Sequence, residues 1–201
     1  MNQTQKKMDK AAIRKMVMIS ILGVIIVVLQ AVATMISSTG LFPVAFTLAL
    51  VPILVGSALY GIGAGTILGT VFGVIVLIID PTAHLLMNIN FLATAVLCIG
   101  KGAAAGFAAG IIYKIVGKIS SLLAIIAAGV AVPIVNTGLF ILGMMTFFND
   151  TIVGWSAGSP SFGSYIIFGL CGINFVVELC VNMLLATAIK TIVSQSKKKT
   201  Q

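Results

Sequence analysis

The sequence has very few charged residues for its length. Only 8% of its 201 residues are Asp, Glu, Lys or Arg, and 60% are hydrophobic, whereas a typical soluble domain is about 25% charged. This composition excludes an ordinary soluble globule. The net charge is +8, but so few charges cannot build a phosphate-binding surface, so nucleic-acid binding is not indicated.

Groups that carry hydrolytic or metal chemistry are equally scarce. The chain has one His, three Cys and four scattered acidic residues. Cys98, Cys171 and Cys180 lie in apolar stretches without a CxxC pair or a nearby His, so we expect small buried side chains and no disulfide or metal site. Neither a GxxxxGK[ST] motif nor a serine in a GxSxG setting is present, so we predict no cofactor, no catalytic residue and no enzyme.

Long apolar runs predict membrane-spanning helices. Such a helix needs about 20 apolar residues, because the hydrocarbon core is ~30 Å thick and a helix rises ~1.5 Å per residue. The uncharged run between Lys15 and Asp80 would form a helix of about 96 Å, so it must fold back twice. The predicted fold class is an all-α polytopic membrane protein, one bundle of six transmembrane helices. Their ranges are 16–36, 43–60, 62–79, 90–113, 120–148 and 165–189.

The basic residues indicate how the bundle is oriented. Six passes place eleven Lys and Arg on one face, and such residues concentrate in cytoplasmic loops. We therefore expect a multi-pass protein of the cell membrane with a basic cytoplasmic segment at 1–15, a membrane domain at 16–193, a basic cytoplasmic tail at 194–201 and an external loop at 149–164. The N-terminus also resembles a cleavable signal peptide, but cleavage would put basic segments on opposite sides. The eleven residues are Lys6, Lys7, Lys10, Arg14, Lys15, Lys114, Lys118, Lys190, Lys197, Lys198 and Lys199.

Glycines recur every four residues on the third and fourth predicted helices. Close backbone approach through small residues is how helices gain contacts in lipid. The two stripes fit either packing inside the bundle or a docking face for another membrane subunit, and the sequence does not separate these interpretations. The glycines are Gly61, Gly65, Gly69, Gly73, Gly102, Gly106 and Gly110.

A polar stripe on the sixth predicted helix consists of Asn174, Glu178 and Asn182, spaced by four so that they share one face. A carboxylate at mid-bilayer costs about 3 kcal/mol or more, so such residues usually face a cavity or a partner. Lys101 on the fourth helix is the expected partner of Glu178, at a depth within about one turn. The pair is either structural or in contact with a substrate.

Further polar positions surround the same region. Pro133 frees a backbone carbonyl, and Asn136 can line the resulting gap. Asn88 and Asn90 open the fourth helix, where we expect at least one of them, with Asn88 a reasonable candidate, to cap it. Trp155 either anchors at the membrane interface or covers a ligand. Gln30 and Thr34 on the first helix either face the cavity or bond to a neighbouring helix; these two complete the polar set.

The order of these features resembles a known family. The segments 42–56, 60–73, 101–110, 133–138 and 174–178 resemble, in order, the second to sixth helices of the substrate-binding S components of energy-coupling factor (ECF) vitamin transporters. The resemblance covers about 16–193. It implies a small membrane protein that captures a vitamin or related micronutrient outside and docks on a membrane coupling subunit driven by two cytoplasmic ATPases.

The resemblance also implies site residues. In the family, ligand contacts come from the external loops and helices four to six, which here hold Asn90, Lys101, Asn136, Trp155, Asn174 and Glu178. The family often docks through an AxxxA pattern on the first helix. The nearest equivalents here pair Ser20 with Val24 or Ile19 with Gly23, and the docking residues implied are Ser20, Gly23, Gly65 and Gly69.

The cargo and two rival functions stay open. Pantothenate, folate, cobalamin and a nucleobase-like precursor all fit the implied site. One rival is a structural or assembly protein that carries no ligand and uses its glycine stripes to bind other subunits. The other is a secondary carrier that uses Glu178 as its proton site.

Overall fold

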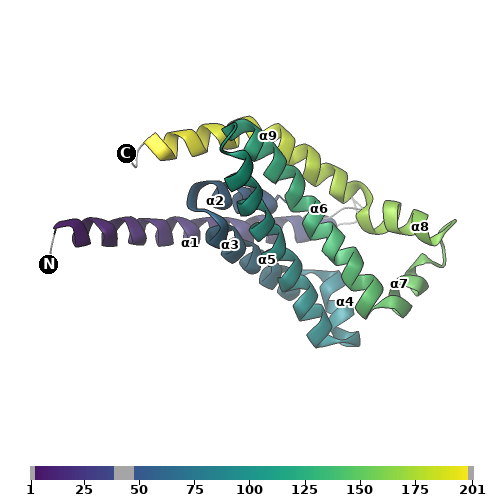
Figure 1. The fold of residues 1–201 in the computed structure, drawn as a ribbon. Helices are drawn as coiled ribbons and strands as arrows, with labels where there is room; N and C mark the ends of the chain where they lie inside the picture. The colour runs from purple at the N-terminus through teal and green to yellow at the C-terminus, as the bar shows by residue number, and fades with distance from the viewer. Residues whose placement is uncertain (1–2, 39–47, 199–201) are drawn as a thin grey trace.

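The computed structural model describes residues 3–38 and 48–198, and every regular element in these ranges is helical. Figure 1 shows the helices gathered into one bundle, with the first part of α1 projecting from it. The predicted all-α fold is confirmed. The elements are α1 (Gln3–Ser38), α2 (Leu50–Tyr60), α3 (Ile62–Ile79), α4 (Pro81–Ile89), α5 (Phe91–Val116), α6 (Ser121–Phe147), α7 (Asn149–Ser156), α8 (Phe162–Ser164), the π-helix η1 (Tyr165–Cys171) and α9 (Gly172–Lys198).

Five of the described helices are long and apolar enough to cross a membrane, namely α1, α3, α5, α6 and α9. The shorter apolar helix α2 has 11 residues. The second predicted pass begins at residue 43, and its first part lies outside the described residues. Large apolar side chains such as Leu92 and Leu184 are exposed by 72% and 78%, as expected where a helix faces lipid rather than water. The chain is a multi-pass membrane protein.

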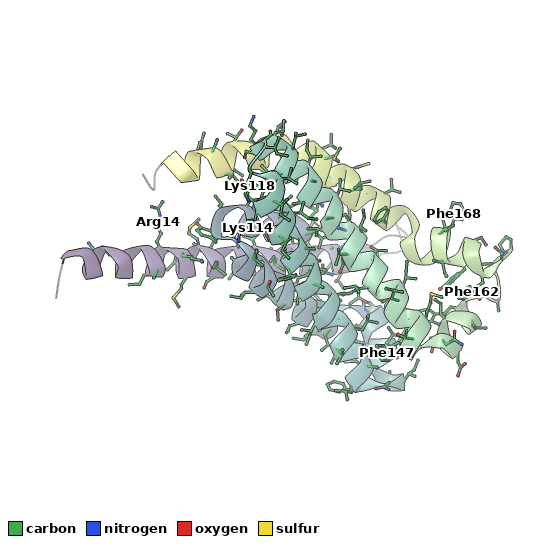
Figure 2. The ribbon with its side chains drawn as sticks, viewed as in Figure 1. Arg14, Lys114, Lys118, Phe147, Phe162 and Phe168 are labelled. Carbon is green, nitrogen blue, oxygen red and sulfur yellow. The ribbon has the colours of Figure 1, made fainter. Side chains whose placement is uncertain are left out.

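Both ends of the chain lie at the same end of the bundle, as the N and C marks in Figure 1 show. Arg14, Lys114 and Lys118 lie toward this end, and Phe147, Phe162 and Phe168 lie toward the opposite one (Figure 2). This arrangement agrees with an even number of passes and with the predicted gathering of basic residues on one face.

Two short helices, α4 and α7, lie where the sequence predicts loops. The Asp80 carboxylate accepts hydrogen bonds from the backbone N–H groups of Thr82 (2.9 Å) and Ala83 (3.1 Å), and Pro81 occupies the first turn of α4. An acidic cap followed by proline starts a helix, so the segment that follows the third pass forms the short helix α4. Helix α7 lies in the predicted 149–164 loop, and its fully buried Ile152 anchors it to the bundle.

The last pass is not one unbroken helix from residue 165. Residues Tyr165–Cys171 form a π-helix, and Gly172, with φ of 50°, ends it and begins α9. A positive φ favours glycine, which explains why the break falls there. Of the cysteines, Cys98 is buried as expected, whereas Cys180 is exposed on α9, so the expectation of burial is wrong for Cys180.

The glycine stripes meet each other. Helices α3 and α5 form the most extensive helix contact among the described elements. A Cβ added at Gly69 would collide with the carbonyl of Gly102, and one added at Gly106 would collide with the carbonyl of Gly65. Of the two interpretations of the stripes, the structure places these glycines in packing inside the bundle. Gly65 and Gly69 are buried against α5, so their part in docking stays a prediction that this arrangement does not favour.

Candidate functional site

Aromatic side chains and one lysine gather at the end of the bundle away from the termini. The Lys101 ammonium lies 4.5 Å from the ring centroid of Phe140, a cation–π contact worth about 0.5–2 kcal/mol according to its desolvation. Trp155 of α7 and Tyr165 of η1 pack with Phe140 against a buried apolar cluster. We call Lys101, Phe140, Trp155 and Tyr165 the aromatic cluster. The apolar residues beneath it are Leu86, Ala93, Leu97, Met144, Phe148 and Ile152.

Asn136 lies one turn deeper than Phe140 on α6. Its side chain is 8% exposed, and among the described residues its Oδ1 atom has no hydrogen-bond partner. A buried acceptor without a donor costs about 1–3 kcal/mol, so such an atom usually marks the place of a water or a ligand. Asn136 and the aromatic cluster therefore supply one buried acceptor, stacking surfaces and one positive charge along a single side of α6.

The two described side chains of the predicted polar stripe, Glu178 and Asn182, pack inward. Glu178 and Asn182 are each 3% exposed, and Asn182 Nδ2 donates a hydrogen bond of 2.9 Å to the carbonyl of Gly129 on α6. This contact joins two helices that run in opposite directions in Figure 1. Glu178 precedes Asn182 by one turn and therefore lies near the level of Pro133, one turn from Asn136.

The contacts that bear on Lys101 and Glu178 meet α6 at different levels. The cation–π contact puts Lys101 at the level of Phe140, and the Asn182 contact puts Glu178 at the level of Pro133. Seven residues of α6 separate these levels, or about 10 Å along the axis. Helix α6 also packs against both α5 and α9. The Lys101–Glu178 pair stays a prediction.

The other predicted contact residues lie apart from this group. Asn90 is exposed, and its Oδ1 accepts a hydrogen bond of 3.0 Å from the N–H of Ala93, which makes it the cap of α5. Capping occupies this oxygen, and no described contact joins Asn90 to the aromatic cluster. The side chain of Asn174 lies outside the described residues. Gln30 of α1 is 2% exposed, and its Oε1 has no hydrogen-bond partner among the described residues.

Two aromatic residues of the site were missed by sequence reasoning. Phe140 follows Asn136 by four residues, so the two share a face of α6, and that spacing was the available signal. Tyr165 is brought to the cluster by the π-helix η1, which no feature of the sequence predicts. Single-turn π segments inside α-helices are often found at functional sites.

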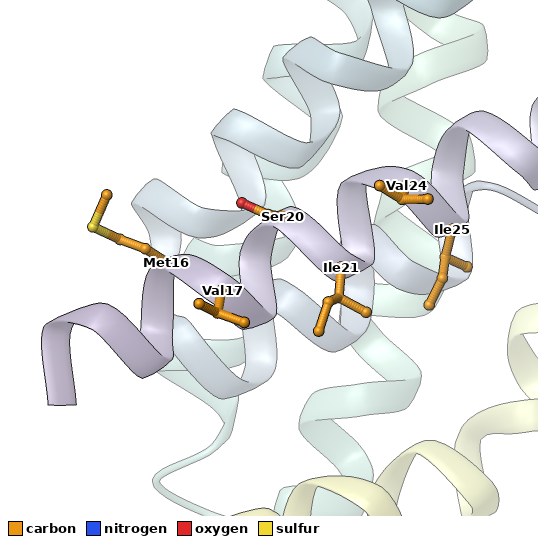
Figure 3. A pocket seen from close by; sticks show the side chains of 6 residues that line it. All are labelled: Met16, Val17, Ser20, Ile21, Val24 and Ile25. Atoms are coloured by element: carbon orange, nitrogen blue, oxygen red, sulfur yellow. The ribbon is translucent and has the colours of Figure 1, made fainter. Parts of the chain in front are cut away.

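Helix α1 presents a separate surface on the outside of the bundle. It packs against α2 and α3, and its opposite face carries two rows of side chains spaced by four residues, which Figure 3 shows. A hollow of about 450 Å³ lies along these rows, lined by Met16, Val17, Ser20, Ile21, Val24 and Ile25. Ser20 and Val24 are exposed, whereas Gly23 is buried beside Leu68. Of the two pairs that the sequence offered for docking, only Ser20 with Val24 lies on the outer face.

These features define a polytopic membrane protein whose polar and aromatic groups lie between the helices at one end of the bundle. A family model described as the ECF transporter, substrate-specific component, matches residues 14–194. The chain belongs to this family, so it is the substrate-binding subunit of an ECF transporter and associates with components of an ECF module. No curated protein and no solved structure matches the chain.

Proposed function

We propose that this subunit captures a vitamin or related micronutrient from outside the cell, in a site formed by the aromatic cluster, Asn136 and Glu178. The observation that carries the proposal is the position of Lys101 over Phe140, one turn from the buried Oδ1 of Asn136, which has no hydrogen-bond partner within residues 3–38 and 48–198. A small planar solute with an anionic group and a hydrogen-bond donor would meet all three kinds of contact. Membership of the substrate-specific family supports the presence of a ligand site in this subunit.

The proposed cargo can be tested by purifying the protein in mild detergent, denaturing it and identifying the released small molecule by mass spectrometry. We expect one compound near one equivalent per chain. Lys101→Met should lose most of it, and Lys114→Met is the matched control, because Lys114 lies on the same helix but is exposed at the other end. Wild-type protein that carries no compound, or equal retention in both variants, would contradict the proposal and favour an assembly protein without ligand.

We further propose that the subunit works with a membrane coupling subunit and two cytoplasmic ATPases, with the α1 face of Ser20 and Val24 as the docking surface. Uptake of the identified compound should then require all partners and ATP. The protein reconstituted alone should not drive uptake down a pH gradient. If it does so, and if Glu178→Gln abolishes that uptake, the protein is a proton-coupled carrier instead.

The orientation proposed for the chain has both termini in the cytoplasm and residues 149–164 outside. The position of both termini at one end of the bundle and the basic residues at that same end support it. In cysteine-free protein, a cysteine at Ser156 should react with an impermeant maleimide added to intact cells. A cysteine at Ser194 should react only after the cells are opened, and the reverse pattern would invert the topology.

A further inference from the structure

The contact between α6 and α9 is built on a missing backbone donor. Pro133 has no N–H group, so the carbonyl four residues earlier, that of Gly129, has no partner within the helix. Helix α6 nevertheless continues from Ser121 to Phe147. The amide of Asn182 donates to that same carbonyl at 2.9 Å. The side chain from α9 therefore replaces the hydrogen bond that the proline removes.

The close approach of the two helices depends on the absence of a side chain at Gly129. A Cβ added there would lie 3.4 Å from Asn182 Cβ and 3.3 Å from Leu54 Cδ2. The first distance is at the edge of ordinary van der Waals contact and the second is slightly shorter, so the helices pack closely here and a side chain longer than alanine would have to displace its neighbours. Glycine, proline and asparagine thus act together, with the glycine giving access, the proline freeing the acceptor and the asparagine supplying the donor.

This contact is polar in an otherwise aliphatic part of the bundle. Ala186, Ile189 and Val193, which continue the buried face of α9, belong to the apolar core. Aliphatic faces in lipid pack without a strong preference for one register, because lipid tails are as apolar as the side chains. A directed hydrogen bond to one carbonyl distinguishes one height of α9 from the next turn. Glu178 lies one turn away on the same face, so its height follows from that bond.

We propose that Asn182 is a positioning residue of the ligand site, which sets the register of α9 on α6 through the Gly129 carbonyl and so holds Glu178 at the level of Pro133 and Asn136. The part of this inference that concerns ligand rests on the proposed function. The part that concerns register does not, and the two have separate measurements.

Register is measured by pulsed EPR between spin labels at Leu142 on α6 and Leu184 on α9. Both side chains are exposed, by 58% and 78%, so labels there leave the core intact, and the three native cysteines are replaced by alanine. We expect one narrow distance distribution in this background. In Asn182→Leu, which keeps the shape but removes the donor, the distribution should gain a component displaced by about 5 Å, one helical turn.

Two further variants separate the donor from general stability. Asn182→Gln keeps an amide donor and should retain the narrow distribution. Ser57→Ala removes a different buried hydroxyl, which lies 3.4 Å from the carbonyl of Gly106, and should lower stability without changing the α6–α9 distance. A narrow distribution in Asn182→Leu, or a displaced one in Asn182→Gln, would overturn the proposal.

If Asn182→Leu does not fold, the double variant Pro133→Ala/Asn182→Leu is measured instead, because alanine restores a backbone donor to the Gly129 carbonyl. The same displaced component is expected in this variant. A narrow distance distribution in it would overturn the proposal. Retention of the co-purified compound is then measured by mass spectrometry. It should fall at least ten-fold in the Asn182→Leu protein and less than two-fold in Ser57→Ala. Displacement with full retention would refute the link to the ligand site, whereas displacement in a protein that never carries a compound would refute the proposed function alone.

Discussion

Gly69→Ala tests whether the glycine stripes hold α3 against α5. The added Cβ would lie closer than 3.0 Å to the carbonyl of Gly102, whereas a carbon and a carbonyl oxygen in contact are about 3.3–3.6 Å apart. The helices must therefore separate by about half an ångström or more. A gap of this size forfeits roughly a quarter to a half of each nearby dispersion contact, and overpacking of this kind typically costs about 1–3 kcal/mol.

The matched control is Gly100→Ala. Gly100 lies on α5, one of the same two helices, and a Cβ there would meet nothing within 4 Å, so alanine should be neutral or slightly stabilising through its higher helix propensity. The free energy of unfolding in detergent is measured for both variants by the same denaturant titration. Equal unfolding free energies for Gly69→Ala and Gly100→Ala would refute the idea that close backbone contact stabilises this pair.

Three other changes have defined outcomes. Asn90→Ala should lower the unfolding free energy by about 1 kcal/mol, the usual loss for a helix cap, without reducing the compound retained; a loss of compound alone would make Asn90 a ligand contact. Lys101→Arg should retain more of the compound than Lys101→Met, because arginine keeps the cation over Phe140; equal loss in the two would argue against a charge contact. Val24→Trp should reduce co-purification with the coupling subunit while leaving the melting temperature within a few degrees, because Val24 is 62% exposed; unchanged assembly would exclude this face from docking.

The long apolar helices could be predicted because their signal is a sum over many residues. A run of 18 or more apolar residues without charge has few alternatives to a membrane helix, and the third pass was predicted with the bounds of α3. The short helices α4 and α7 depend on single features, such as the Asp80 cap followed by Pro81. A prediction based only on the length of apolar runs does not detect such helices.

The sequence identifies the polar residues of the candidate site, but it does not predict how the helices place them relative to one another. Asn136 and Glu178 stand out because a polar residue in an apolar helix needs a reason. The relative heights of the helices depend on which atoms meet, such as the hydrogen bond from Asn182 to the carbonyl of Gly129 between α9 and α6. Counting residues from the ends of the predicted helices cannot supply contacts of this kind, so the depth match of Lys101 and Glu178 stays a prediction.

The pairing of the two glycine stripes also bears on where a partner can dock. Helices α3 and α5 use their smoothest faces on each other, so these faces are not available to a partner unless the bundle opens along its most extensive contact. The extensive contacts of α1 with other described helices are those with α2 and α3. Its outer face carries the small Ser20 between Met16 and Val24. A partner can reach this row without disturbing α5, α6 or α9. In such an arrangement docking and ligand binding use different helices, so a substitution at Ser20 and one at Lys101 should have independent effects.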